Sequence, residues 1–375
     1  MTICNDILET GQVLRINYIS PRPSLAGGTK STRLICEAMV RRGHDVRIIF
    51  PVKSGNLPPL WRIRTFIKHA RKRLLSVLKP PSHHLLTSTA KLIPVPKTEV
   101  EASDVPDADV TICSWWRSME FVQNWPADKG IKVHYIRGHE IWAEEERVAR
   151  LYRSECLKVV NSHWLNSLMQ SKYGLTAVVV HNGIDRDQFD SIPRARTHDG
   201  CVGFVYSHQP VKDAETALAA LRLVQQEIPG LRVNCFGASP LASGLKLPNS
   251  FNFRFSPNQS EISDIYRSAD CWVIPSRSEG LPMPGLEAAA CRCPIVATRC
   301  GGTEDYVRDG VNGYLVPVGD ARVMADRILD VLRAPSNRWT EMSEACYEIS
   351  KGFDWDRSAE NLERFLVSSV RLSRG

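Results

Sequence analysis

The chain has 375 residues, and since a single hydrophobic core stops growing at about 250–300 residues, this length predicts two domains. The formal net charge of +7 favours a negatively charged partner, such as nucleic acid, an anionic membrane surface or a phosphorylated substrate. The 11 cysteines form no C-x-x-C pair, which argues against a zinc ribbon and a small disulfide scaffold and predicts reduced core thiols. The first residues do not resemble a secretory signal, and no apolar run reaches the roughly 20 residues of a spanning helix. We therefore expect a cytoplasmic protein, soluble or peripheral on a membrane.

The N-terminal part of the chain begins with a β-loop-α-β pattern. Residues 13–20 form a short apolar run, a loop with two glycines and an amphipathic stretch ending at Gly43 follow, and a second apolar run reaches Phe50. Further β-branched runs alternate with helical patterns at residues 108–114, 131–138, 156–174 and 176–185. Strands that alternate with helices predict a parallel sheet covered on both faces.

The segment from Trp61 to Pro81 has a different pattern. On a helical wheel its apolar residues gather on one face and its Arg and Lys residues spread over the other. One interpretation is that residues Trp61 to Lys79 form a helix that lies in an anionic membrane interface. An equally good interpretation is a helix packed on the core with a solvated basic face.

The α/β pattern starts again after the polar segment Asp190 to Gly200. Six further short strands are predicted within residues 201–207, 231–238, 251–257, 270–276, 293–298 and 313–319. The fold class is therefore α/β, with two Rossmann-like parallel-sheet domains that face each other across a cleft. Ligands of such sheets bind beyond the carboxyl ends of the strands.

Two glutamates flank a loop of Gly and Pro in the second half. Glu279 precedes the loop, and Glu287 follows it in a predicted helix that has Pro284 in its first turn. A helix N-terminus binds phosphate through its backbone amides, and Gly280 and Gly285 allow close approach. Carboxylates accept hydrogen bonds from vicinal hydroxyls, so the pattern suits a nucleotide-sugar with ribose at one carboxylate, diphosphate between and sugar at the other. The alternative is that Glu287 complements the helix dipole and Glu279 is a solvated turn residue.

The string "PSRSEGLPMPGLEAAACRCPIVATRCGGTEDYVRDGVNGYLVPVGD" resembles the donor-site segment of the retaining glycosyltransferases of family four (glycosyl transferases group 1), which have the GT-B fold. The matching elements are the two glutamates at E-x7-E spacing, the Gly-Pro loop, the "PIVAT" strand, the Gly-Gly turn and the "DGVNGYLV" ending. "VVVHNGIDRDQF" also resembles the end of the first domain in this family. The resemblance implies an acceptor-side domain at 1–192 and a donor domain at 193–375, with the last helix, about 355–375, as a candidate to cross back.

The resemblance also assigns roles to the loop. Glu287 would hold the ribose hydroxyls and Glu279 the hydroxyls of the transferred sugar. The sugar and phosphates of the donor would contact the backbone of Gly280, Leu281, Pro282 and Met283.

Family members usually carry an Arg and a Lys after the first strand of the second domain, and these grip the diphosphate. Lys212 matches the Lys, although it can also be an ordinary lysine at a helix start. Tyr206 or Ser207 stands where Arg is expected, and Asp213 replaces the usual Gly. Lys cannot imitate the bidentate guanidinium of Arg. Either His208 or another basic residue compensates for the missing Arg, or the departure marks a subfamily.

Four further candidates lie in the first half. Gly27 and Gly28 precede a helix without the G-x-G-x-x-G spacing of a dinucleotide site. In the family this loop lies against the donor phosphate and the acceptor, whereas a plain β-α turn explains the glycines equally well. His139 follows the strand 131–136 and matches the family histidine near the reacting carbon, and Arg137 can take this role instead.

These features together predict a retaining glycosyltransferase that moves a hexosyl group from a nucleoside-diphosphate sugar to a hydroxyl of a saccharide or lipid-linked saccharide in glycan or polysaccharide biosynthesis. His139, Lys212 and Glu279 are the expected catalytic residues, and loop amides and helix dipoles would stabilise the leaving diphosphate. No D-x-D motif occurs at the expected site, so we expect neither a metal nor another cofactor. The alternatives are a GT-B sugar-nucleotide epimerase or phosphorylase and, from another class, a basic nucleic-acid-binding protein, for which no recognition motif is present.

Overall fold

The computed structural model describes residues 12–53, 83–140, 144–197, 200–243, 245, 247 and 250–374. The chain divides into two compact units, one drawn from Met1–Ile136, Ile141–Val159 and Ala359–Gly375, the other from Arg137–Glu140 and Val160–Ser358. The basic helix predicted from Trp61 to Lys79 lies outside the described residues. None of the described helices has the length and hydropathy needed to cross a bilayer.

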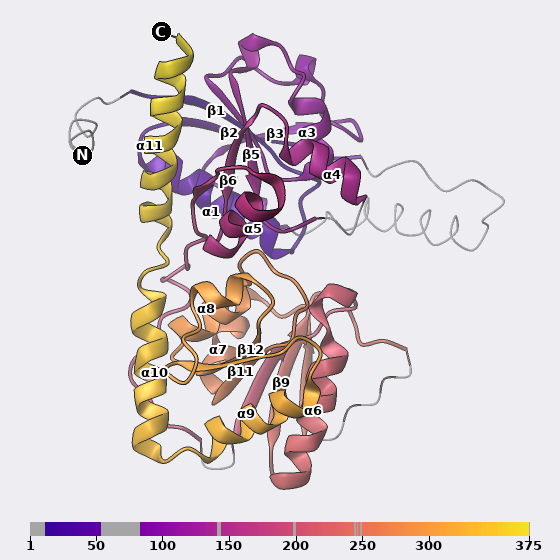
Figure 1. The fold of residues 1–375 in the computed structure, drawn as a ribbon, viewed down its shortest axis with the longest axis vertical. Coiled ribbons are helices and arrows are strands. Elements are labelled where there is room, and N and C mark those ends of the chain that lie inside the picture. Colours follow the sequence, from indigo (N-terminus) through magenta and orange to yellow (C-terminus); the bar gives the residue numbers. More distant parts are fainter. Residues whose placement is uncertain are drawn as a thin grey trace, which may run out of the picture. The chain divides into compact units, whose positions relative to one another are not determined.

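The first sheet has seven strands in the order β3-β2-β1-β4-β5-β6-β7 (Figure 1). Its inner strand β1 pairs in parallel with β2 and with β4, so that Ile16 lies opposite both Val46 and Val110. Four of the five residues of β1 are buried, as expected for a parallel strand covered on both faces. The strands are β1 Arg15–Ile19, β2 Asp45–Pro51, β3 Lys91–Val95, β4 Val110–Cys113, β5 Ile131–Ile136, β6 Leu157–Val160 and β7 Val178–Val179.

The helices that follow these strands begin and end at recognisable signals. Ser162 caps the N-terminus of α5 by accepting a hydrogen bond from the amide of Leu165 (3.1 Å), and Gly174 ends the helix in the left-handed conformation. The helices are α1 Gly27–Arg41, α3 Trp116–Val122, α4 Glu145–Tyr152 and α5 His163–Tyr173, with short 3₁₀ turns η1 His84–Thr87, η2 Ala102–Asp104 and η3 Ala127–Lys129.

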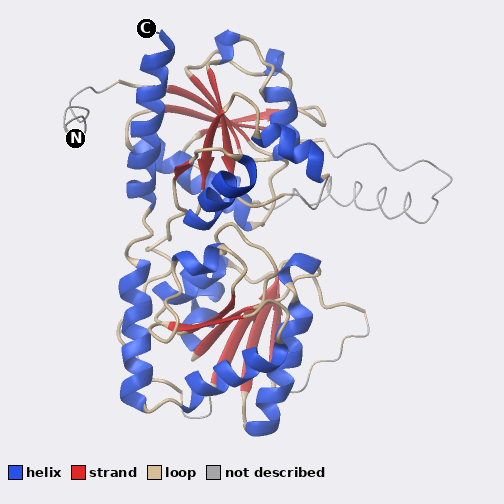
Figure 2. Cartoon of the chain, viewed as in Figure 1, coloured by secondary structure: helices blue, strands red, loops and turns tan. Residues whose placement is uncertain are grey.

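The second sheet has six strands in the order β10-β9-β8-β11-β12-β13, and the recorded strand pairs are parallel. Figure 2 shows helices on both faces of this sheet. The strands are β8 Cys201–Val205, β9 Arg232–Gly237, β10 Phe251–Phe255, β11 Cys271–Ile274, β12 Ile295–Thr298 and β13 Gly313–Val316. The predicted α/β class with two parallel sheets is therefore confirmed.

Strand β11 illustrates how the second sheet is buried on both sides. Cys271 and Val273 join the core with α6 and α9, whereas Trp272 and Ile274 join the core with α7 and α8. This alternation follows from the two-residue period of a strand. The helices are α6 Ala214–Glu227, α7 Gln259–Ser268, α8 Met283–Ala290, α9 Ala321–Arg333, α10 Ser336–Ser350 and α11 Trp355–Arg374, with 3₁₀ turns η4 Pro210–Lys212 and η5 Gly302–Asp305.

The segment Asp190 to Gly200, where the sequence predicts the domain boundary, separates the strands of the two sheets. Helix α11 belongs to the first unit from Ala359 onward. There, Glu363 pairs with Arg42 and lies 3.1 Å from the imidazole of His44. Ion pairs of this kind are worth little individually, so the buried apolar side of α11 contributes most to its docking.

The cysteines of the described residues are all free thiols, and all except Cys156 are buried. Burial raises the pKa of Cys235 to about 12, which keeps the thiol protonated and unreactive. The prediction of reduced core thiols is therefore confirmed for this part of the chain.

Candidate functional site

The strand order of the second sheet reverses direction at its centre. The chain runs from β8 outward through β9 and β10 on one side and then returns to β11 on the other side of β8. In open α/β sheets such a reversal is the point where ligands bind, beyond the carboxyl ends of the two neighbouring strands. Here the loops that leave β8 and β11 carry Lys212 and Glu279.

Lys212 and Glu279 form an ion pair between these two loops, from the ammonium to the carboxylate oxygen Oε1. The hydroxyl of Ser276 donates to the same oxygen over 2.9 Å. The side chain of Glu279 is 16% exposed and that of Lys212 is 36% exposed, so both remain accessible to a ligand. The structure thus brings together two residues that the sequence predicts for the donor site.

The Gly-Gly turn after β12 holds the candidate loop in place. The amide of Glu279 donates to the carbonyl of Cys300 (2.9 Å), and the amide of Gly302 donates back to the carbonyl of Glu279 (3.0 Å). Gly301 has φ +113°, and a Cβ on Gly302 would overlap the backbone of Gly280. Larger residues are therefore excluded from this turn.

Gly280 is also required by a second close approach. A side chain at this position would overlap the carbonyl oxygen of Arg137, which in turn accepts a hydrogen bond from Asn161 (3.4 Å). In the described part of the chain, the amides of Gly280 and Leu281 make no hydrogen bond. They precede the N-terminus of α8, where the helix dipole favours an anion.

Glu287 lies in the second turn of α8. It is only 7% exposed, and its Oε2 accepts a hydrogen bond of 2.8 Å from the phenol of Tyr266. Burial and the neighbouring carboxylate of Glu287 raise the pKa of Tyr266 well above its usual value, so the phenol stays a donor. This bond fixes the orientation of the Glu287 carboxylate, and its contact with ribose stays a prediction.

Asp213 shows why the family prefers glycine at this position. Its backbone is left-handed (φ 45°, ψ 48°), a conformation that Asp tolerates better than most residues, and its carboxylate caps α6 through the amide of Thr216 (3.3 Å). The other carboxylate oxygen lies 2.9 Å from the guanidinium of Arg277, whose side chain is 56% exposed. Arg277 was not singled out from the sequence, although it lies two residues before Glu279.

The residues at the usual arginine position point elsewhere. Tyr206 is buried, and its hydroxyl accepts a hydrogen bond from the amide of Ala242 (3.1 Å). The imidazole of His208 lies 2.7 Å from the carbonyl of Pro240. The amide of Gln209 donates to the hydroxyl of Ser207 (3.2 Å). None of these side chains replaces the missing guanidinium, whereas Arg277 lies beside the residue that follows Lys212.

The remaining candidates lie on other elements. The Nε2 atom of His139 lies 2.8 Å from the hydroxyl of Tyr173, at the end of α5. Gly27 and Gly28 form the first turn of α1 in the first unit. Apart from neighbouring backbone of the same helix, none of the described residues has an atom within 4 Å of where the Cβ atoms of these two glycines would be. Packing therefore gives no reason for two glycines at this position. Approach of a ligand to the start of α1 remains the predicted reason.

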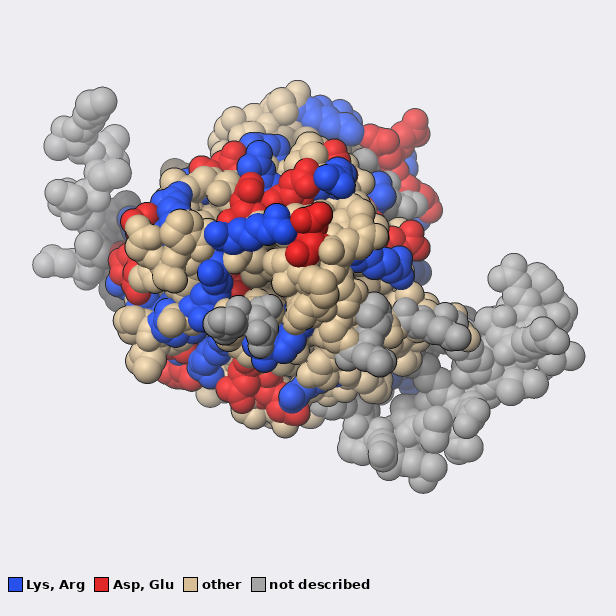
Figure 3. All heavy atoms as spheres, turned by 90° about the horizontal axis from the view of Figure 1, so that it is seen from below, with Lys and Arg blue, Asp and Glu red and all other residues tan. Residues whose placement is uncertain are grey.

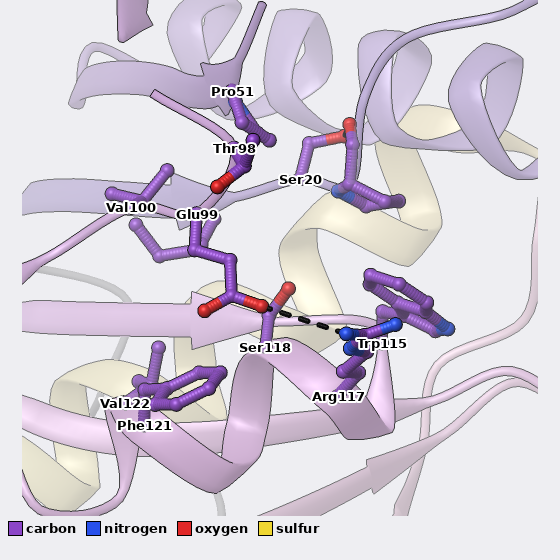
Figure 4. A pocket seen from close by; sticks show the side chains of 12 residues that line it. Ser20, Pro51, Thr98, Glu99, Val100, Trp115, Arg117, Ser118, Phe121 and Val122 are labelled. Atoms are coloured by element: carbon purple, nitrogen blue, oxygen red, sulfur yellow. Dashed lines mark hydrogen bonds and ion pairs between the residues drawn. The ribbon is translucent and has the colours of Figure 1, made fainter. Parts of the chain in front are cut away.

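The first unit contains a hollow beyond the carboxyl ends of β1, β2 and β4 (Figure 4). Trp115 and Phe121 supply apolar surface to it, and Ser118 supplies a hydroxyl. Glu99 and Arg117 face each other there, with 3.7 Å between carboxylate and guanidinium. An aromatic ring beside paired charges and hydroxyls is a lining that suits a polar ligand with apolar faces.

Charges of both signs are interspersed on the face of the molecule drawn in Figure 3. Ion pairs between neighbouring helical side chains are one reason, such as Arg322 with Asp326 (3.4 Å) and Arg327 with Asp330 (2.7 Å) on α9. The described residues on this face therefore form no extended basic surface of the kind that nucleic-acid-binding proteins present.

Solved structures with similar folds define the class of protein. Sucrose-phosphate synthase from Thermosynechococcus elongatus superposes with a TM-score of 0.69 at 17% identity, over 94% of this chain and 99% of that chain. The Anabaena protein HepE in complex with UDP-glucose superposes with a TM-score of 0.66 at 16% identity, over 95% of this chain and 100% of that one. These likenesses identify the GT-B fold, as the sequence resemblance predicts.

Sequence comparison finds a similar family for the second unit. Residues 199–334 match the model of the family described as glycosyl transferases group 1. The chain is 32% identical over 205 residues to D-inositol 3-phosphate glycosyltransferase of Mycobacterium avium, which covers 49% of this chain and 47% of that protein. The corresponding protein of Mycolicibacterium smegmatis is 34% identical over 206 residues, or 49% of this chain and 45% of that protein. The chain spans about half the length of these curated relatives. Within the second unit, residues 199–334 are therefore similar to the glycosyl transferases group 1.

Proposed function

We propose that this protein is a retaining glycosyltransferase that transfers a hexosyl group from a nucleoside-diphosphate sugar to a hydroxyl of a saccharide or lipid-linked saccharide. The observation that carries the proposal is the contact between Lys212 and Glu279 at the point where the strand order reverses. A cation for the diphosphate and a carboxylate for the sugar are thereby adjacent to a helix N-terminus. The UDP-glucose in the solved HepE complex and the glycosyltransferase activity in the relatives' names support the same class of donor.

The diphosphate would be bound by Lys212, by the amides of Gly280 and Leu281, and by Arg277. The unpaired amides and the dipole of α8 provide a preorganised site for negative charge. Arg277 is held beside Lys212 by Asp213 and offers the planar, bidentate guanidinium that is missing at residues 206 and 207. Its exposed position lets it turn from the carboxylate of Asp213 to a phosphate.

The sugar and the ribose would be bound on either side of this cradle. The Glu279 carboxylate would accept hydrogen bonds from the sugar hydroxyls and Glu287, oriented by Tyr266, from the ribose hydroxyls. We propose a same-face mechanism in which the leaving phosphate assists deprotonation of the acceptor, with His139 or Arg137 near the reacting carbon. Because the cations and amides named above neutralise the leaving group, the reaction would need no divalent metal ion.

The acceptor would be bound by the first unit. The hollow between Trp115, Phe121 and the Glu99–Arg117 pair has the apolar and polar surface that a sugar ring needs, and Gly27 and Gly28 leave the start of α1 open. Residues Trp61 to Lys79 would contact anionic lipid at the cytoplasmic face of a membrane. This location would bring the protein to a lipid-linked acceptor and suits a role in glycan or polysaccharide synthesis.

A thermal-shift screen against UDP-, GDP-, dTDP- and ADP-sugars tests the proposal. A ligand at a hundredfold excess over its Kd stabilises the folded state by about 2.7 kcal/mol, which is a readable change in Tm. We expect one sugar nucleotide to shift the wild type and the surface control Glu341→Ala, to shift Glu287→Ala much less, and to bind Arg277→Gln more weakly. Glu341 is a suitable control because it only pairs with Arg338 on the surface of α10. The absence of any shift with all four classes would contradict the proposal.

A further inference from the structure

Two histidines and an aspartate that the donor site does not use lie together in the second unit. His163 is the first residue of α5, His181 follows β7, and Asp305 is the last residue of η5. One ligand atom from each of these side chains can be chosen so that all three lie within 4.8 Å of one another. Residues up to 142 positions apart in the sequence thus converge on one point.

The geometry of this His163–His181–Asp305 cluster is close to that of a metal site. The Nε2 atom of His181 lies 2.9 Å from Oδ2 of Asp305, and the two imidazole rings have centroids 5.0 Å apart. Two ligand atoms that each lie about 2.0–2.1 Å from a tetrahedral Zn²⁺ ion are about 3.3 Å apart. The Nε2 atom of His181 and Oδ2 of Asp305 would therefore have to move apart only slightly to bind an ion between them. His163 is exposed and can turn toward it without moving the backbone.

The surrounding structure holds the carboxylate of Asp305 in this position. Its side chain is only 4% exposed, and its Oδ2 accepts a hydrogen bond from the amide of His163 (2.7 Å). The amide of Trp164 also faces this carboxylate, with 3.4 Å between the nitrogen and Oδ1. These contacts fix the position of a buried carboxylate next to both histidines.

His181 is equally well positioned. Its ring packs edge-on against Phe353, with 5.3 Å between centroids, and its carbonyl accepts a hydrogen bond from Ser358 (2.7 Å). The ring is 25% exposed, so the cluster is closed by protein on one side and open to solvent on the side of His163. A site with three protein ligands and an open fourth position is typical of zinc bound together with water.

We propose that His163, His181 and Asp305 bind one divalent transition-metal ion, with Zn²⁺ as the best match and water as the fourth ligand. Two imidazoles and one carboxylate suit Zn²⁺ and its neighbours in the first transition series, whereas Mg²⁺ and Ca²⁺ prefer oxygen ligands alone. The ion would replace the direct hydrogen bond between His181 and Asp305. Its binding does not depend on the proposed glycosyltransferase activity, because it uses none of the donor-site residues.

A metal ion at this site would tie three segments of the second unit together. These are the start of α5, the residues after β7, and η5, which directly follows the Gly301–Gly302 turn that holds the candidate loop. An ion that binds the folded state only stabilises it by mass action, so the Tm should rise with Zn²⁺ concentration. This consequence can be measured without any donor or acceptor.

Titration of the full chain with Co²⁺ and Zn²⁺ tests the site. We expect one Co²⁺ per chain with visible absorption typical of a nitrogen and oxygen site, displacement of Co²⁺ by Zn²⁺, and a Tm that rises with Zn²⁺. His163→Ala should weaken binding at least about tenfold while leaving the metal-free Tm unchanged, because the ring is exposed. His181→Ala should weaken binding as well, and His208→Ala, an exposed histidine on another loop, should bind as the wild type does.

Three results would overturn the proposal. The first is a wild-type protein that binds neither ion at micromolar concentrations. The second is His163→Ala with unchanged affinity, since the exposed histidine can be removed without unfolding the chain. The third is an intense near-ultraviolet thiolate band with Co²⁺, which would assign the ion to cysteine.

Discussion

Replacing Glu279 by Gln separates the structural role of this carboxylate from its proposed role in donor binding. In the structure it accepts hydrogen bonds from Ser276 and from Lys212, whose side chain is 36% exposed. A pair this exposed is worth about 0.2–1 kcal/mol, so the free energy of unfolding should hardly change. For domains of this size such a loss lowers the Tm by about 4 °C at most.

The expected effect on the donor is larger. A hydrogen bond to a charged acceptor contributes about 1.5–3 kcal/mol, so the affinity for the sugar nucleotide should fall by about tenfold to a hundredfold. The corresponding nucleoside diphosphate lacks the sugar, and its affinity should stay constant or rise, because Lys212 no longer has a competing carboxylate. Isothermal titration of Glu279→Gln and wild type with both ligands measures this difference. Equal changes for the two ligands would refute the contact with sugar, and a large fall in Tm would make Glu279 a structural residue.

Two further variants test the loop and a buried histidine. In Gly280→Ala the new Cβ overlaps the carbonyl of Arg137, so we expect the free energy of unfolding to fall by about 1–3 kcal/mol and the sugar nucleotide to raise the Tm less. The control Gly230→Ala has open space around the new Cβ and should match the wild type. Equal stability of the two variants would show that the loop can move away from Arg137. His134 is fully buried, and burial lowers its pKa to about 3, with the charge of Lys158 adding to the effect. Below about pH 6.5 the unfolded chain takes up a proton at His134, whereas the folded chain does not until the pH nears 3. The contribution of neutral His134 to the free energy of unfolding is therefore complete above pH 6.5 and falls as the pH falls toward 3. Between pH 6.5 and pH 5 this loss is about 2 kcal/mol. Urea unfolding of His134→Phe should show a smaller loss over this range than the wild type and than His208→Phe, and an unchanged loss would assign the pH dependence to other groups.

The element order of the second unit could be predicted because each segment carries local signals. The apolar run of β11, the glycines of the loop and Pro284 at the start of α8 lie within 15 residues of one another in the sequence, and each acts on its own neighbours. β3 has no such signal. Its central residues include Pro94, which argues against a strand, and the strand is possible because β3 lies at the edge of the first sheet, where a missing amide donor is tolerated.

The contacts within the candidate site could be predicted only in part. The E-x7-E spacing identifies Glu279 and Glu287 from the sequence, but the ion pair of Glu279 with Lys212 joins residues 67 positions apart. It exists because β8 and β11 are neighbours, and strand order is a property of the whole sheet. The bond from Tyr266 to Glu287 likewise depends on how α7 packs beside α8. The His163–His181–Asp305 cluster joins three separate segments and has no local pattern at all.

The two departures from the family pattern are connected in the structure. Where the family has Gly, Asp213 adopts the same left-handed backbone, and its carboxylate both caps α6 and pairs with Arg277. Where the family has Arg, Tyr206 is buried in the core instead. A glycine at 213 could not hold Arg277 beside Lys212, and an arginine at 206 or 207 would make that arrangement unnecessary. We therefore expect the second positive charge of the proposed diphosphate site to come from Arg277, on the loop after β11, and not from the loop after β8.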